Sequence, residues 1–154
     1  QKNAKVIFLS PQGKKLNQSA VIEFSKLSGI ILVCGRYEGI DERAIDAWSM
    51  EEISLGDYIL SGGEPAAISL IDASVRLLPG VMGSDLSQNE ESFERGLLEY
   101  PQYTRPRIWR ERSVPDVLLS GHHDKVRAWR QTEAEKTTRE RRPDLWDLYA
   151  TTRN

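Results

Sequence analysis

The stretch KVIFLSPQGKKLNQSAVIEFSKLSGIILVC, residues 5–34, predicts a strand, a helix and a second strand in that order. Residues 5–10 are rich in β-branched and aromatic side chains, and Pro11 and Gly13 predict the end of this first strand. Residues 30–34 are apolar without alternation, which is typical of a parallel-sheet strand covered on both faces. The stretch therefore predicts a βαβ unit and an α/β fold.

The next part of the chain continues the α/β pattern. A short helix is expected near residues 43–48 and a short strand over residues 52–55. Pro65 suits the first turn of a helix, and apolar side chains then recur at helical spacing as far as Leu78. Pro79 and Gly80 end this helix, so residues 1–81 are expected to form one α/β domain.

The C-terminal part of the chain, from residue 82 onward, differs in composition. Residues 82–105 are rich in Ser, Glu and Asn, and this pattern predicts a linker between domains. Residues 106–154 are expected to form a small helical domain, with a long helix over residues 122–141 that breaks at Pro143.

Charge separates the two regions more clearly than hydropathy does. The chain of 154 residues has a net charge of −2, but residues 1–101 contain 9 basic and 15 acidic side chains. Residues 102–154 contain 12 basic and 8 acidic side chains, with Trp and Tyr between the arginines. Arginine interleaved with aromatic residues is typical of surfaces that bind phosphates and stack on bases, although a solvated helix face has the same composition.

Several classes of protein are excluded or disfavoured. The longest apolar stretch, residues 30–34, is far too short to cross a bilayer, so no membrane helix is expected. Cys34 is the single cysteine, which permits no intrachain disulfide and favours a cytoplasmic location. The glycine and histidine motifs of Rossmann dehydrogenases, P-loop NTPases, zincins and common serine hydrolases are absent. The chain begins with Gln1 instead of Met, so a longer protein with an upstream segment is expected.

Three glycine-bearing turns are the candidate binding elements. They lie at residues 10–13, 35–39 and 55–64, and two of them directly follow strands. Loops at the carboxyl ends of parallel strands converge on one crevice, and glycine lets the backbone approach a ligand closely. The pattern favours a site that holds an adenine or a ribose by main-chain groups. Each glycine alone is equally compatible with a simple tight turn.

Three other functions remain open from the residues alone. A nucleotide-binding phosphotransferase would need Lys or Arg in these turns, where only Arg36 is available. A non-catalytic RNA-binding fragment would use the basic C-terminal region and bind no methyl donor. An α/β scaffold protein would use neither feature.

The strings VIFLSPQG, LVCGRYEGIDER, LGDYILSGGEPAAISLIDA, GLLEYPQYTRP and VLLSGHH resemble the bacterial tRNA (guanine-N1)-methyltransferases, the TrmD family of the SPOUT superfamily. The resemblance covers nearly the whole chain. It implies a parallel sheet with a deep trefoil knot, and a homodimer with the active site at the subunit interface. It also implies transfer of a methyl group from S-adenosylmethionine to N1 of guanosine at position 37 of tRNA, next to the anticodon.

The resemblance implies that residues of the three turns bind the methyl donor. The residues implied to contact S-adenosylmethionine are Ser10, Pro11, Gln12, Gly13, Gly35, Tyr37, Glu38, Leu55, Gly56, Asp57, Tyr58, Ile59, Leu60, Ser61, Gly62 and Gly63.

The resemblance also implies the catalytic and RNA-binding groups. Glu91 stands where the family has an aspartate, and it is the expected base for the N1 proton, with Glu90 as an alternative. Arg76 matches the arginine that stabilises negative charge on guanine O6. Magnesium is implied as an aid to transfer, although no metal-ligand set is expected in the sequence. The residues expected to contact tRNA are Tyr103, Arg105, Lys125, Arg127 and Arg130.

Overall fold

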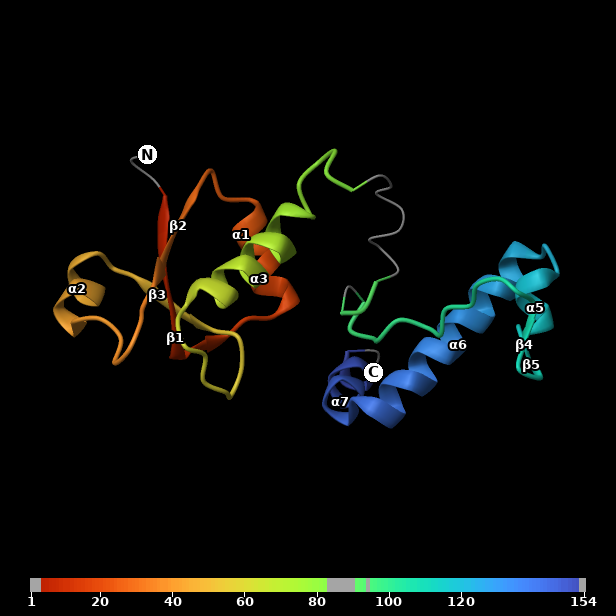
Figure 1. Cartoon of the computed structure of the whole chain (residues 1–154). Coiled ribbons are helices and arrows are strands. Elements are labelled where there is room, and N and C mark those ends of the chain that lie inside the picture. Colours follow the sequence, from red (N-terminus) through yellow and green to blue (C-terminus); the bar gives the residue numbers. More distant parts are fainter. Residues whose placement is uncertain (1–3, 83–90, 94, 153–154) are drawn as a thin grey trace. The chain divides into compact units, whose positions relative to one another are not determined.

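The chain folds into two units (Figure 1). The computed structural model describes residues 4–82, 91–93 and 95–152. The first unit comprises residues 1–83 and the second comprises residues 84–154. Helices and strands alternate in the first unit, whereas helices dominate the second.

The first unit is built on a three-stranded parallel sheet. Its strands are β1 (Lys5–Lys15), β2 (Ile30–Cys34) and β3 (Glu51–Ser54), and their spatial order is β2-β1-β3. Both outer strands pair parallel to β1, with Val6 opposite Ile31 on one side. The predicted βαβ unit is confirmed.

Strand β1 is longer than the sequence predicts. It continues past Pro11 to Lys15, because Leu9 and Lys14 both pair with Ile53 of β3. The pairing register shifts between these two residues, so the intervening turn leaves the regular ladder without ending the strand. The expectation that Pro11 and Gly13 stop the strand was wrong, since pairing with β3 resumes beyond them.

Among the described residues, two helices connect these strands and a third follows the last of them. Helix α1 (Gln18–Ser25) begins after Asn17, whose side-chain oxygen accepts a hydrogen bond from the Ala20 N–H at 3.0 Å. Helix α2 (Glu42–Ala47) lies in the segment expected to be helical, and helix α3 (Glu64–Val75) has proline in its first turn, as predicted. Helix α3 ends at Val75, three residues before the expected end.

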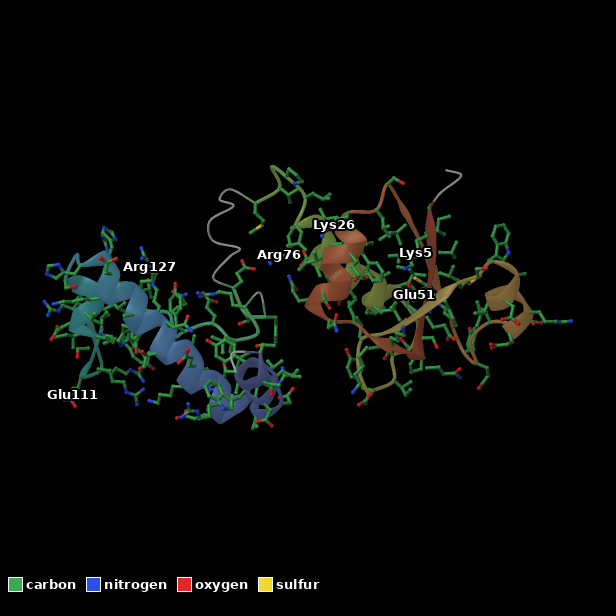
Figure 2. The ribbon with its side chains drawn as sticks, turned by 180° about the vertical axis from the view of Figure 1, so that it is seen from behind. Lys5, Lys26, Glu51, Arg76, Glu111 and Arg127 are labelled. Atoms are coloured by element: carbon green, nitrogen blue, oxygen red, sulfur yellow. The ribbon has the colours of Figure 1, made fainter. Side chains whose placement is uncertain are left out.

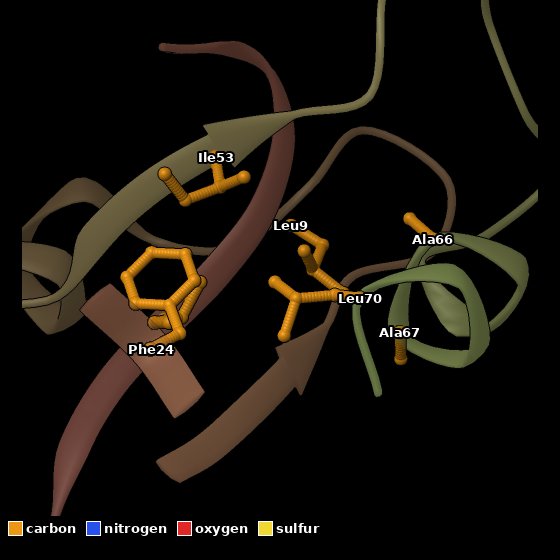
Figure 3. Close-up of a cluster of buried hydrophobic side chains, with 7 residues drawn as sticks. Leu9, Phe24, Ile53, Ala66, Ala67 and Leu70 are labelled. Carbon is orange, nitrogen blue, oxygen red and sulfur yellow. The ribbon is translucent and has the colours of Figure 1, made fainter. Parts of the chain in front are cut away.

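The core of the first unit lies between the sheet and the helices α1 and α3. Figure 3 shows Leu9 and Ile53 of the sheet beside Phe24 of α1 and Leu70 of α3. Burial of these side chains is the main source of stability for the unit. Strand β2 is less covered than predicted: Ile31 is 49% exposed, so the described residues do not cover both of its faces.

The described residues of the second unit form a small hairpin and three helices. Its elements are β4 (Ile108–Trp109), β5 (Arg112–Ser113), α5 (Asp116–Leu119), α6 (His123–Arg141) and α7 (Pro143–Thr151). The long helix agrees with the prediction over residues 122–141, and Pro143 begins a new helix as it ends the old one. The hairpin was not predicted, because two-residue strands leave no periodic signal.

Part of the expected linker packs on helix α6. Leu97 and Tyr100 are buried with Ala134 of α6 in the second unit's core. The backbone N–H of Leu98 donates to Oγ1 of the buried Thr138 at 2.8 Å. Residues 97–100, which the sequence assigns to a linker, are therefore fastened to the second unit. No helix within the described ranges is long and apolar enough to span a membrane.

Candidate functional site

A cavity of about 280 Å³ lies at the carboxyl ends of the parallel strands. The turn within β1, the segment after β2 and the segment after β3 line it together, as the three glycine-bearing turns predicted. Of the residues expected to bind the methyl donor, the cavity is lined by Ser10, Pro11, Gln12, Gly35, Tyr37, Glu38, Leu55, Gly56, Tyr58, Ile59, Leu60, Ser61, Gly62 and Gly63.

The remaining two expected donor residues lie outside this lining and have other contacts. A Cβ on Gly13 would lie 2.3 Å from the carbonyl carbon of Glu52, so its lack of a side chain lets β1 approach β3. The carboxylate of Asp57 pairs with Nζ of Lys15. Both residues thus help to hold the strands and turns that border the cavity.

The segment after β3 is closed onto the end of β2. The Gly63 N–H donates to the Gly35 carbonyl at 3.0 Å, and Gly62 forms an isolated β-bridge with Arg36. A Cβ on Gly63 would lie 2.9 Å from Cα of Cys34. This close backbone approach requires glycine at position 63, and it brings two turns that are distant in the sequence to one wall of the cavity.

The cavity wall contains exposed aromatic and apolar side chains. Tyr58 is 56% exposed and Ile59 is 81% exposed, so neither belongs to the core of the first unit. Tyr37 is fully exposed and has a left-handed backbone with φ of 56°, which is uncommon for a bulky residue. These side chains are available to cover an apolar or aromatic ligand.

Sequence reasoning missed several lining residues between positions 36 and 45. The cavity is also lined by Arg36, Gly39, Ile40, Glu42 and Ile45. They belong to GRYEGIDE and to the helix α2 that follows. Their signal was their position directly after a parallel strand, where side chains face the ligand crevice.

Arg36 and Glu64 form an ion pair at this wall. Nη2 of Arg36 lies 2.8 Å from Oε1 of Glu64. The pKa of Glu64 is lowered, first by the hydrogen bond from its own backbone N–H and then by the bond from Arg36. Burial, together with the Glu64 charge, raises the pKa of the Cys34 thiol. Arg36, the one arginine of the three turns, is thus paired with Glu64 at the cavity wall.

The two expected catalytic residues belong to different units. Arg76 is half-buried at the end of α3, where its N–H donates to the Asp72 carbonyl at 3.2 Å. Glu91 is half-buried at the start of a turn in which the Phe93 N–H donates to the Leu97 carbonyl at 2.7 Å. The alternative base, Glu90, lies outside the described residues. Figure 2 labels Arg76 in the first unit, together with Lys5, Lys26 and Glu51.

The residues expected to contact tRNA lie in the second unit. The Tyr103 ring is 6.2 Å from that of Trp129, and the Arg130 guanidinium lies 4.8 Å from the Tyr100 ring centroid. Arg127 is exposed on α6 and lies 3.4 Å from a carboxylate oxygen of Asp124. Both further candidates are also exposed: Arg105 and Lys125.

No metal centre is visible in the part of the chain that the structure describes. Within it, no group of three or more His, Cys, Asp or Glu side chains is placed to hold an ion. His122 precedes the first turn of α6, but its side chain makes no capping hydrogen bond.

The family described as tRNA (Guanine-1)-methyltransferase TrmD matches residues 1–148. The chain belongs to this family. Relatives named tRNA (guanine-N(1)-)-methyltransferase include one from Pelagibacter ubique, 57% identical over 94% of this chain and 64% of its own length. Another from Cereibacter sphaeroides is 54% identical over 96% of this chain and 59% of its own length. A third from Chelativorans sp. is 61% identical over 91% and 60%.

The chain thus spans about three fifths of the length of the relatives it matches. Its match to the methyltransferase family includes both units, because the matched range extends through α6 and into α7. The mixed α/β structure with a parallel three-stranded sheet agrees with the family resemblance stated from the sequence.

Proposed function

We propose that the chain forms the donor-binding and tRNA-binding parts of an enzyme that methylates N1 of guanosine at position 37 of tRNA. The observation that carries this proposal is the cavity at the carboxyl ends of three parallel strands, in a chain of the tRNA (guanine-1)-methyltransferase family. Its walls combine bare backbone at glycines with exposed aromatic side chains. Such a wall suits a nucleoside better than it suits a phosphate.

S-adenosylmethionine is the methyl donor in this proposal. The residues present fit it: Gly35 and Gly62 place backbone without side chains on the cavity wall, and Tyr58 and Ile59 offer apolar cover. The Glu38 carboxylate is available for the positive amino group of the methionine end. The donor supplies a methyl group on a sulfonium, so no acid is needed to activate the leaving sulfur.

The chemistry at guanine needs a base and an electrostatic partner. Neutral guanine carries a proton on N1, and this proton passes to the carboxylate of Glu91 as N1 forms its bond to the methyl carbon. The bond between that carbon and sulfur breaks, leaving a neutral thioether and a neutral methylated base. The Arg76 guanidinium stabilises the negative charge that develops on O6. The family resemblance supports both assignments.

The second unit is the proposed tRNA-binding domain, and its residues 102–154 carry an excess of basic side chains. Its exposed Arg105, Lys125 and Arg127 suit contacts to phosphates, which supply most of the affinity of proteins for nucleic acids. The expected linker, residues 82–105, connects it to the donor-binding unit in this proposal. Magnesium, as in the family, is proposed to assist transfer without a resident protein cage.

The trefoil knot, the homodimer and a cytoplasmic location belong to the same proposal. The homodimer would place the active site at the subunit interface, where residues from a second copy complete the cavity. These assignments rest on the family resemblance.

Calorimetric titration with S-adenosylmethionine tests the donor site. The chain should bind the donor, and Tyr58→Ala should weaken binding at least tenfold by removing an aromatic wall of the cavity. Trp48→Ala is the matched control, because Trp48 is also an exposed aromatic residue but does not line the cavity. Equal weakening by both variants would contradict the assignment of the cavity.

Catalysis is tested separately with an unmodified tRNA transcript and radiolabelled donor. Glu91→Gln should abolish methyl transfer while donor affinity stays within twofold of that of the parent. Full activity in Glu91→Gln would transfer the role of base to another group. Absence of donor binding, both by the chain and by a version extended to the length of its relatives, would overturn the methyltransferase proposal.

A further inference from the structure

The hairpin formed by β4 and β5 exposes an arginine beside a tryptophan at its tip. Trp109 is 54% exposed and Ile108 is 62% exposed, and neither belongs to the core cluster of the second unit. The guanidinium carbon of Arg110 lies 4.9 Å from the centroid of the Trp109 ring. The indole is therefore partly covered by a cation and otherwise open to solvent.

The turn of this hairpin is built from residues that do not favour it. Arg110 and Glu111 have φ values of 47° and 64°, both in the left-handed region. Two-residue hairpin turns of this kind favour Asn-Gly, because glycine adopts positive φ without steric strain. Figure 2 shows Glu111 at this end of the second unit. Long side chains thus occupy two positions where glycine would be more stable.

Positive charge is concentrated around the hairpin. Residues 105–112 contain four arginines and one glutamate. Arg107 lies 3.0 Å from a carboxylate oxygen of Asp116, and within the described ranges Arg110 and Arg112 have no carboxylate at ion-pair distance. The surplus guanidinium groups favour an anionic ligand, and the neighbouring indole favours a ligand with a flat ring.

We propose that this hairpin binds single-stranded RNA, with an unpaired base stacked on Trp109 and the flanking phosphates bound by Arg110 and Arg112. The proposal rests on the proposed function, because tRNA supplies the RNA. Stacking on an exposed aromatic residue, combined with arginine at the phosphates, is a general way of binding unpaired nucleotides. A protein partner with an apolar surface would gain nothing from the arginines. RNA is therefore the ligand that better matches the charge of this hairpin.

Stacking of a base on Trp109 is tested by comparing the binding of two RNAs of equal length. Fluorescence anisotropy should show that the full chain binds a labelled anticodon stem-loop and a labelled, fully paired duplex. Trp109→Ala should weaken binding of the stem-loop at least tenfold and binding of the duplex less than threefold. Trp109→Phe, which keeps a ring, should retain most of the affinity for the stem-loop.

The contribution of the Arg110 charge can be tested with a matched control, Glu111→Gly, in the same turn. Arg110→Gly and Glu111→Gly each place glycine at a left-handed position, so both should preserve or strengthen the fold in thermal unfolding. Only Arg110→Gly removes a cation. It should weaken binding of the stem-loop severalfold and reduce the slope of log affinity against log salt by about one. Glu111→Gly should bind as tightly as the parent or more tightly.

The possible results separate this inference from the proposed function. Stem-loop binding that is unchanged in Trp109→Ala and Arg110→Gly overturns the hairpin assignment, and so does an equal loss for both RNAs. If these variants instead change the oligomeric state in sedimentation with RNA binding intact, the hairpin is a protein interface and the assignment fails. Absence of RNA binding by the parent chain overturns both proposals, whereas donor binding tests the methyltransferase proposal alone.

Discussion

The two units offer ligands very different surfaces. In the first unit, a cavity is shaped by backbone turns that pack on a parallel sheet. In the second unit, exposed guanidinium groups and rings lie on a helix and a hairpin, within residues 102–154, where basic side chains outnumber acidic ones. Ligand affinity at a cavity formed by packing depends on the stability of the core beneath it. Ligand affinity at a surface of exposed charges depends on the salt concentration of the solution. The two should therefore respond to different perturbations.

The largest effect is expected from a cavity in the core of the first unit. Leu70 is 1% exposed and packs under the sheet, so Leu70→Ala should lower the free energy of unfolding by about 2–5 kcal/mol. Helix α3 begins at Glu64, directly after the turn that lines the cavity, so donor affinity should fall as well. Urea unfolding and calorimetry with S-adenosylmethionine measure the two effects.

The same helix supplies the control for this prediction. Ile68 is 67% exposed, and Ile68→Ala should change the free energy of unfolding by less than about 0.5 kcal/mol. A loss as large as that of Leu70→Ala would mean that this face of α3 is covered in solution. Concentration dependence of the unfolding midpoint would then identify a second copy as the cover.

Salt should affect the second unit far more than the first. If Arg105, Lys125, Arg127 and Arg130 each neutralise one phosphate, tRNA affinity should fall about 50-fold to 150-fold between 50 and 200 mM salt. Affinity for S-adenosylmethionine should change less than about twofold over this range, because main-chain contacts are hardly screened. Equal sensitivity of the two ligands would contradict the contrast between the units.

Local signals in the sequence predicted the first unit well. Strand β2 was located at its exact residues, because an unbroken apolar run of five residues between Gly29 and Gly35 leaves few alternatives. Pro65 indicated the start of α3, because its fixed φ suits a first helical turn. The three turns were located because each interrupts or follows a strand.

Features that depend on distant partners could not be predicted in this way. Strand β1 continues beyond Pro11 because Lys14 finds Ile53 in β3, which lies far along the chain. Leu97 and Leu98 pack on α6 through Ala134 and Thr138, although their local sequence resembles a loop. Local propensity is overridden in both places by tertiary contacts.

The buried hydroxyl of Thr138 in the second unit should contribute less to the free energy of unfolding than the Leu70 side chain does in the first. The Thr138 hydroxyl accepts from the Leu98 N–H at 2.8 Å and donates to the Ala134 carbonyl at 2.7 Å. Thr138→Val keeps the shape but leaves the Leu98 N–H without this acceptor, so it should lower the free energy of unfolding by about 1–3 kcal/mol.

Thr138→Ser separates the hydroxyl from the methyl group. Serine keeps the acceptor, so it should retain more of the stability than valine does, with only the loss of a buried methyl of about 1 kcal/mol. Hydrogen exchange at the Leu98 amide should rise in the valine variant and stay protected in the serine variant. Equal exchange in the two variants would contradict the role of this hydrogen bond.

The smallest effect concerns acid stability at the cavity wall. The pKa of Glu64 is lowered by its own backbone N–H and then by Arg36, so the charged carboxylate stabilises the fold above the ordinary glutamate pKa of about 4.3. This contribution is lost as the pH falls through the lower pKa of the folded state. The difference in melting temperature between the parent and Glu64→Gln should therefore be present at pH 7 and should shrink steadily below about pH 4.3.

The same comparison in an Arg36→Gln background separates the two causes. Arg36→Gln should reduce the pH-dependent difference that Glu64→Gln makes, without removing it, because the backbone hydrogen bond at the start of α3 remains. Complete loss of the difference in Arg36→Gln would show that the ion pair alone sets the acidity of Glu64.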